Sequence, residues 1–412
     1  LRALEFLMSG TTGAGSYRVL LADQIARRAF VVAAVGRFGY ALLPLCLLFT
    51  IVQATGSFAV AATASALFGI SGLVMPAQSR LVDRRGQSCV LPVVGAGFVA
   101  GLIAMALLGL SDVSAAWVWY GTALLAGVTA PALGPSMRAQ WRELTTPAQR
   151  PTAYSLDAVT EEIVFLLGPI AAAGVLATGP AWRGVLVVAA LIPVGVIGLA
   201  RSPAAPPPRP VTEPAAGRAD WLGPLRRGPF RRLLTVMALA GVSMSAALTG
   251  VAALADAHHQ PSATGLVEAG GGVMAILGGL YWGRRQARGQ WQRELAGLLL
   301  LRAPFMGACV LLPHLWSVGT LVALASVAVS PLYVVAFTTS DQLAPTAQHT
   351  EASTWVTALT NTGTSLGTAL AGWTFSHGGT APVFAAITAL LAMAALCALT
   401  PTSRPRTGPA VD

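Results

Sequence analysis

Long apolar segments recur along the chain and are separated by short stretches that contain polar residues. An α-helix rises about 1.5 Å per residue, so about 20 apolar residues cross the roughly 30 Å of hydrocarbon in a bilayer. Twelve such segments predict transmembrane helices over residues 29–53, 57–80, 89–110, 115–137, 153–177, 181–200, 232–255, 262–283, 294–312, 316–340, 352–375 and 380–400. The pattern predicts an all-α polytopic membrane protein, because a helix satisfies its own backbone polar groups within the bilayer.

Composition supports this class and removes soluble ones. Of the 412 residues, 55% are hydrophobic and only 10% are charged, and the mean hydropathy is +0.67. A water-soluble surface cannot be built from so few charges. The net charge of +10 would favour nucleic acid as a partner of a soluble protein. Here membrane topology accounts for the arginines, and no nucleic-acid partner is expected.

The arginines predict the orientation in the membrane, because cytoplasmic loops retain positive charge during insertion. Six segments hold 23 of the 26 arginines: 1–28, 80–88, 138–152, 201–232, 284–293 and the tail after residue 400. Of the other three, Arg183 lies in an outer loop, while Arg37 and Arg302 lie within predicted spans. We therefore expect a multi-pass protein of the cell inner (cytoplasmic) membrane with both termini in the cytoplasm.

The one long connection between spans, with three consecutive prolines from Pro206, divides the chain into two halves of six spans. The residues that follow span 2, 79–86, read SRLVDRRG, and those that follow span 8, 279–286, read GLYWGRRQ. An internal duplication explains this sequence similarity between the two halves. The expected units are a cytoplasmic N-terminal segment, a six-helix bundle, a cytoplasmic linker, a second six-helix bundle and a cytoplasmic tail, over 1–28, 29–200, 201–231, 232–400 and 401–412.

With these features the whole chain resembles the major facilitator superfamily. The sharpest match is the motif after span 2, G-x-x-x-D-R-x-G-R-R, which Asp83, Arg84 and Gly86 meet and Ser79 departs from, as do Gln87 and Ser88. The resemblance implies two six-helix bundles that carry a small-molecule solute by alternating access. A glycine lets such a loop turn sharply, and an Asp near helix ends can bond a partner and hold one conformation. The second copy has Gly283 in place of the Asp, so we expect a weaker contact there.

A second match lies in span 5, where Gly168 and Pro169 resemble the start of the G-P-x-x-G-G core of the drug and proton antiporters of this superfamily. Ala172 and Ala173 replace its second pair of glycines. The alternative is an ordinary kink with tight packing. Many of these antiporters carry an Arg inside span 4, and residues 123–134 contain no charge, so that Arg is expected to be absent.

Charged residues inside predicted spans are candidates for proton coupling, because an unpaired charge is costly in hydrocarbon. Arg37 and Glu161 both lie roughly 12 Å from the cytoplasmic side, at 1.5 Å per residue. Asp157 is one helical turn from Glu161 on the same face, and Glu162 is adjacent. Because the resemblance places spans 1 and 5 side by side, Arg37 is expected within reach of these carboxylates. They either exchange a proton during transport or form a permanently ionised structural pair.

The second half has two further charges inside spans. Glu268 in span 8 is the equivalent candidate there, or else a carboxylate near the interface that reaches water. Arg302 in span 9 is expected to snorkel or to pair structurally rather than to touch solute.

Polar residues in span 11 recur at steps of four, three and four and so mark one helical face: Thr357, Asn361, Thr364 and Thr368. They either line a substrate cavity or hydrogen-bond to neighbouring helices. Gly363 and Gly367 are spaced for close contact with another helix. The resemblance adds Ser245 of span 7 and Tyr333 of span 10 as cavity candidates.

Catalysis is disfavoured, because the loops carry no nucleotide-binding glycine loop, no metal-ligand spacing and no nucleophile elbow. No cofactor or metal is expected. A polytopic membrane transferase would need an acidic cluster at a loop, which Asp341 alone does not supply.

The acids within the membrane outnumber Arg37 and Arg302, and with the partial Gly-Pro motif they favour a proton-coupled antiporter for efflux of a lipophilic or cationic small molecule. A proton-coupled importer of a small metabolite is the alternative. The expected partners are the solute, protons and membrane lipids.

Overall fold

The computed structural model describes residues 17–69, 71–111, 113–207, 220–260, 262–284, 290–312 and 314–400. Within these ranges every regular element is an α-helix or a 3-10 helix. The expected cytoplasmic tail, residues 208–219 of the linker and most of the N-terminal segment lie outside the described residues.

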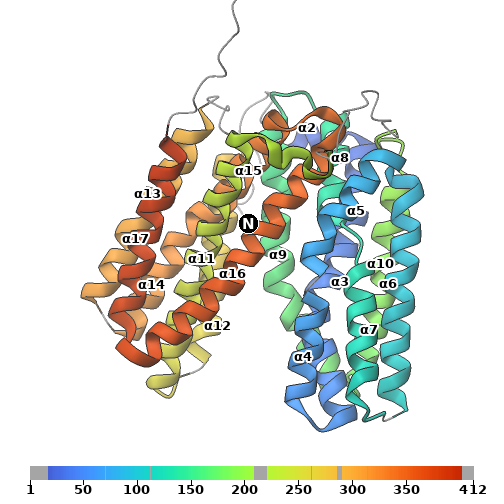
Figure 1. Ribbon diagram of the computed structural model, residues 1–412, viewed down its shortest axis with the longest axis horizontal. Helices are drawn as coiled ribbons and strands as arrows, with labels where there is room; N and C mark the ends of the chain where they lie inside the picture. Colours follow the sequence, from blue (N-terminus) through green and yellow to red (C-terminus); the bar gives the residue numbers. More distant parts are fainter. Residues whose placement is uncertain are drawn as a thin grey trace, which may run out of the picture.

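The helices follow the predicted spans, and Figure 1 shows them in two groups. The first group comprises α2 (Tyr17–Ala22), α3 (Gln24–Thr55), α4 (Phe58–Gly69), α5 (Ser71–Arg85), α6 (Gln87–Leu110), α7 (Ala116–Thr129), α8 (Leu133–Leu144), α9 (Arg150–Ala177) and α10 (Trp182–Ala200). The second comprises η1 (Asp220–Arg226), α11 (Gly228–Ala257), α12 (Ser262–Trp282), α13 (Trp291–Leu311), α14 (Leu315–Ala325), η2 (Ser326–Ala328), α15 (Val329–Leu343), η3 (Thr346–Gln348), α16 (His349–Gly378) and α17 (Thr380–Leu399).

Ten helical segments of the described chain are long and apolar enough to cross a membrane. The other two predicted spans correspond to α4 with α5, and to α16, which carries the polar face noted above. Together they give the twelve spans expected from the hydropathy pattern.

Local sequence sets several helix ends. The side chain of Asp23 accepts a hydrogen bond from the Ile25 N–H and caps α3. Gly56, with φ of +68°, ends the same helix in the left-handed region that glycine adopts without strain. Gly86 has φ of +84° between α5 and α6, so the sharp turn predicted for the loop after span 2 is present.

Span 4 is longer than its apolar pattern suggested. The helix breaks over residues 130–132, beside Pro131, and resumes as α8. The resumed helix ends at Leu144 instead of residue 137, and the combined segment Ala116–Leu144 is itself a candidate span. Consequently Arg138 and Arg142 lie in a helix and not in a loop, which corrects their expected placement.

Small residues allow helices to pack closely. Helix α3 contacts α9 and α10, and α11 contacts α16. A Cβ atom added to Gly363 or Gly367 would collide with the carbonyl oxygens of Ala238 or Val242 on α11. A Cβ at Gly168 of α9 would collide with Ala41 of α3. Gly363 and Gly367 therefore form the expected close-packing face, and Gly168 serves packing as well.

Candidate functional site

Three buried charged residues meet inside the first group of helices. Asp157 of α9 accepts from Arg37 of α3, with Oδ1 2.5 Å from Nη2, and from Arg138 of α8, with Oδ2 3.2 Å from Nη1. Arg37, Arg138 and Asp157 are 6%, 2% and 1% exposed. The expected contact between Arg37 and the acidic face of span 5 is present. Each carboxylate oxygen of Asp157 is thus committed to one guanidinium.

Arg138 overturns one expectation from the sequence. Span 4 does carry a buried arginine, in the part of the helix that follows the break. The guanidinium lies 3.8 Å from the centre of the Phe337 ring, and Nη2 is 3.5 Å from Oγ1 of Thr357. Both partners belong to the second half. The sequence does contain an indication that the helix continues past Arg138. After Pro135 no helix-breaking residue occurs until Pro147, so a helix over residues 133–144 could have been predicted.

Glu161 lies one turn beyond Asp157, within electrostatic range of both Arg37 and Arg138. Unlike Asp157, it accepts no hydrogen bond from the residues that the structure describes. Two guanidiniums and two carboxylates therefore share this region, which is neutral when both acids are ionised and positive when one binds a proton. We call Arg37, Arg138, Asp157 and Glu161 the charge cluster.

A cavity of about 550 Å³ opens beside this cluster, between α9 and helices of the second half. Its three charged residues are Glu162 of α9, Glu268 of α12 and Arg302 of α13. Apolar side chains make up much of the remaining wall and include Phe165, Leu166, Pro169, Ile170, Met244 and Leu248. A site of this size accommodates a drug-sized molecule.

The cavity agrees only in part with the residues expected to line it. Ser245 and Thr364 line it, but Thr357, Asn361, Thr368 and Tyr333 do not belong to its lining. Thr357 lies against Arg138, and the Thr368 and Ser245 hydroxyls hydrogen-bond to each other. Tyr333 stacks on Phe337 and is within electrostatic range of groups from both halves: Glu161, Glu162, Arg138 and Arg302.

Arg302 does not snorkel or pair with an acid, contrary to expectation. Its side chain is 3% exposed and lines the cavity. Nη1 lies 3.5 Å from Oγ of Ser243, a long contact, and Nε has no hydrogen-bond partner. None of the ion pairs among the described residues includes Arg302. With Arg138, three arginines are buried rather than two, so the excess of the four acids within the spans over the buried arginines is smaller than expected.

The two halves meet at one end of the molecule, where α5 contacts α16 (Figure 1). Arg80 forms an ion pair with Glu351, with Nε 2.9 Å from Oε2. Asp83 accepts the backbone N–H groups of Thr350 and Glu351, at 3.3 and 3.0 Å, near the start of α16. A carboxylate in this position compensates the positive end of the helix dipole. We call Arg80, Asp83, Glu351 and the start of α16 the charged contact.

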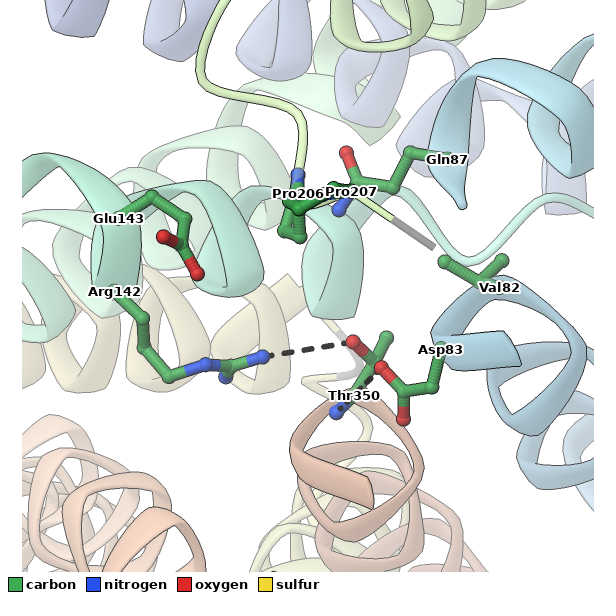
Figure 2. A pocket seen from close by; sticks show the side chains of 8 residues that line it. All are labelled: Val82, Asp83, Gln87, Arg142, Glu143, Pro206, Pro207 and Thr350. Carbon is green, nitrogen blue, oxygen red and sulfur yellow. Dashed lines mark hydrogen bonds between the residues drawn. The ribbon is translucent and has the colours of Figure 1, made fainter. Parts of the chain in front are cut away.

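Figure 2 shows Asp83 and Arg142 approaching Thr350 from different helices. The Thr350 hydroxyl lies 3.5 Å from Nη2 of Arg142, so Asp83 is linked to Arg142 through this residue rather than by a direct ion pair. Arg142 also donates to Asp341 of α15 at 3.1 Å, and Tyr154 donates to the same carboxylate. Burial raises the pKa of Asp83 to about 6, against the lowering effect of its hydrogen bonds and of Arg142.

A second contact closes the same end and uses the duplicated loop after α12. Thr152 donates to the Gly283 carbonyl at 2.6 Å, Tyr17 donates to the Leu280 carbonyl at 3.1 Å, and Ser155 donates to the Gly279 carbonyl. The Tyr17 and Ser155 hydroxyl oxygens lie 2.9 Å apart, so either hydroxyl can donate to the other in place of its carbonyl. No ionised side chain takes part in these bonds. We call this set the neutral contact.

The remaining predicted residues are placed as follows. Arg84 is exposed beside Asp83, and Glu268 is exposed while lining the cavity. No group of three or more His, Cys, Asp or Glu side chains in the described ranges could hold a metal ion.

The family model described as Major Facilitator Superfamily matches residues 29–328. The chain belongs to this superfamily. No curated protein is significantly similar to it in sequence. The superfamily assignment indicates a transporter.

The fold of this superfamily member is similar to those of several solved transporters. The human organic anion transporter MFSD10 (TETRAN) has a TM-score of 0.73 and 17% identity, covering 90% of this chain and 99% of that one. A bacterial homologue of the iron transporter ferroportin, in an outward-facing state, has a TM-score of 0.73 and 15% identity, covering 92% and 99%. The E. coli fucose:proton symporter FucP has a TM-score of 0.66 and 12% identity, covering 90% and 98%.

Proposed function

We propose that this superfamily member is a proton-coupled exporter of lipophilic or cationic small molecules, of the drug and proton antiporter type. The observation that carries the proposal is the environment of Glu161. It lies within range of two guanidiniums, accepts no hydrogen bond from the described residues, and is adjacent to Glu162 in the cavity wall. Asp157 stays ionised and paired with both Arg37 and Arg138, which leaves Glu161 as the group that exchanges a proton.

The arrangement of α9 supports an outward-open conformation. Thr152 and Ser155 of this helix bind the closed end, and Pro169 lines the cavity. Ser155 and Pro169 are separated by about 21 Å along the helix, at 1.5 Å per residue. Since the arginine distribution assigns the closed end to the cytoplasm, the cavity lies on the outer side of the charge cluster.

Proton coupling then follows from charge balance. A proton that enters from outside neutralises Glu161, and Asp157 is left facing two guanidiniums. The excess positive charge disfavours a cationic solute in the neighbouring cavity, so protonation promotes its release to the outside. After the transporter opens inward, loss of the proton restores the negative charge and favours binding of the next cation. Proton and solute thus compete and move in opposite directions.

Glu161→Gln tests this proposal in proteoliposomes that contain a lipophilic cation. We expect transport driven by a pH gradient to be lost. Exchange of solute without a gradient should persist at a raised solute concentration, because Gln mimics the protonated acid and weakens cation binding without removing it. Asp157→Asn is the matched comparison, because it removes the counter-ion of two buried arginines and should lower protein abundance and every transport mode. Gradient-driven transport that survives in Glu161→Gln at the rate of the unaltered protein contradicts the proposal.

Orientation is tested separately by cysteine labelling with a membrane-impermeant reagent. The exposed native Cys89 and the partly exposed Cys397 are first replaced by Ala. We expect Arg201→Cys to react from the cytoplasmic side and Trp117→Cys, at the other end of the helices, to react from outside. Labelling of Arg201→Cys from outside would overturn the proposed topology.

A further inference from the structure

Arg302 is the one charged side chain of the cavity wall that the exporter proposal leaves without a role. Glu162 and Glu268 suit a cationic solute, whereas a guanidinium repels one. Of the three, only Arg302 is nine-tenths or more buried. Its position in the middle of α13 places it far from either end of that helix, so it cannot serve as an interfacial arginine.

A buried guanidinium without an acid is costly in a membrane protein, because its hydration is lost and no opposite charge replaces it. The described partners of Arg302 are one long contact with the neutral Ser243 hydroxyl, and the phenol of Tyr333 within electrostatic range. The Nε–H group has no acceptor. An anionic group that enters the cavity would supply the missing charge and the missing acceptor. A guanidinium binds carboxylate or phosphate through two parallel hydrogen bonds.

The acids of the same cavity are located on other helices. Glu162 belongs to α9 in the first half, Glu268 belongs to α12, and Arg302 belongs to α13. Neither Glu forms an ion pair with Arg302 among the described residues. The cavity therefore presents a positive group and two negative groups at separate places, with an apolar wall that includes Phe165, Ile170 and Met244.

We propose that the transported solute is a zwitterionic amphiphile, whose anionic group binds Arg302, whose cationic group faces Glu162 and Glu268, and whose apolar body contacts the remaining wall. This inference rests on the proposed export function and narrows its substrate class. The two carboxylates alone would select any lipophilic cation. Arg302 adds a preference for those that also carry a carboxylate or phosphate.

Three probes with a common aromatic body test the inference: butyltriphenylphosphonium as the cation, (4-carboxybutyl)triphenylphosphonium as the zwitterion, and 4-benzhydrylbenzoate as the anion. Binding to the purified full chain is measured by quenching of tryptophan fluorescence. We expect the zwitterion to bind at least about tenfold more tightly than the cation, the effect of one charge-assisted hydrogen-bonded pair. In Arg302→Gln that preference should disappear while the affinity for the cation is retained or increased.

Two control variants distinguish loss of zwitterion binding at Arg302 from a general change in the protein structure. Arg183→Gln removes an exposed arginine outside the cavity and should leave the preference intact. Arg302→Lys keeps the charge but loses the paired hydrogen bonds, so it should retain part of the preference. Thermal unfolding of each variant, monitored without probe, shows whether the protein remains folded.

The outcomes distinguish this inference from the proposed function. A preference for the zwitterion that survives in Arg302→Gln, or a cation that binds the unaltered chain as tightly as the zwitterion, overturns the inference and leaves cation export standing. Binding of the anion alone, lost in Arg302→Gln, overturns the zwitterion and the cationic substrate together. Binding of none of the three probes also overturns both. The binding is also measured in gluconate and in chloride buffers. If the preference for the zwitterion is present in gluconate but absent in chloride, Arg302 binds a free inorganic anion and the inference is overturned.

Discussion

The end of α5 and the duplicated segment at the end of α12 both bind the opposite half of the molecule, but they do so by different chemistry. The first uses the charged contact, in which Arg80 and Asp83 hold Glu351 and the start of α16. The second uses the neutral contact, in which hydroxyl groups bind backbone carbonyls around Gly283. Gly283 is the position of the second copy that corresponds to Asp83. Tyr17 and Ser155 occupy the space that a side chain at Gly283 would fill. One contact therefore depends on charge and pH, and the other depends on shape.

This difference has a consequence for transport, because the neutral contact and the charge cluster share α9. Thr152 and Ser155 bind the loop after α12, and Asp157 and Glu161 follow within two turns. A movement of α9 that accompanies protonation of Glu161 would break weak neutral hydrogen bonds first. The charged contact would then contribute more than the neutral contact to holding this end closed. Variants that weaken each contact separately test this difference in strength.

The largest effect is expected for Glu351→Gln, which removes the acid of the charged contact. Glu351 is 1% exposed and accepts hydrogen bonds from Arg80. Loss of this charge-assisted pair should shift the free energy of opening by about 2–3 kcal/mol, which raises the ratio of open to closed molecules roughly 30- to 150-fold. Distances between spin labels at residues 84 and 349 report the opening. Asp256→Asn, an exposed acid near the end of α11, is the control and should change nothing. An unchanged distance distribution in Glu351→Gln would show that the pair does not hold this end.

Gly283→Ala should have the next largest effect, because it disrupts the neutral contact by shape alone. The added Cβ would lie 2.5 Å from Oγ of Ser155 and would collide with the Tyr17 hydroxyl. Overpacking of this kind costs about 1–3 kcal/mol. The same pair of spin labels should show a partial opening. Gly297→Ala, where an added Cβ meets nothing within 4 Å, is the matched control. If Tyr17→Phe fails to relieve any of the effect, the steric explanation is wrong.

A change of pH should act directly on the charged contact, through Asp83. In the closed end burial raises the pKa of Asp83 to about 6, whereas an exposed Asp titrates near 4. The closed end therefore binds a proton more tightly than the open end, and acid favours closure. Between pH 7 and pH 5 the closed population should rise about tenfold relative to the open one. Asp83→Asn should abolish this response, and a response of undiminished size in that variant would assign the pH dependence to another group.

Thr152→Val should give the smallest effect, because it removes one neutral hydrogen bond while keeping the shape of the side chain. The expected destabilisation of the closed end is about 0.5–1.5 kcal/mol, measured by the same spin-label distances. An effect as large as that of Glu351→Gln would remove the distinction between the two contacts.

The spans and three of the four residues of the charge cluster could be predicted from the sequence, by hydropathy and helix geometry together with the family resemblance. Arg37 could be placed beside the acidic face that carries Asp157, because Arg37 and Glu161 have equal depths and the resemblance makes spans 1 and 5 neighbours. Gly86 could be placed at a turn from its motif, and its positive φ agrees. The spans and the turn depend on residues within one helix or one loop, whereas the contact of Arg37 with α9 was expected from the family resemblance.

The rest of the site depends on contacts between distant segments, which one sequence does not record. Asp341 and Glu351 form their ion pairs with arginines 199 and 271 residues away. The prolines of span 4 end the apolar pattern early, so the sequence alone places Arg138 in a loop. Arg302 departs from the expectation that it snorkels or pairs structurally, because hydropathy does not show which face of a helix lines a cavity.

The most direct test of the account is a count of the protons released when a solute binds. A saturating amount of butyltriphenylphosphonium is added to the purified protein in weakly buffered detergent, and a pH indicator follows the solution. The account predicts proton release on binding to the unaltered protein, and none from Glu161→Gln at equal occupancy. Equal release from both proteins, or binding to the unaltered protein without any release at every pH tested, would contradict proton exchange at Glu161.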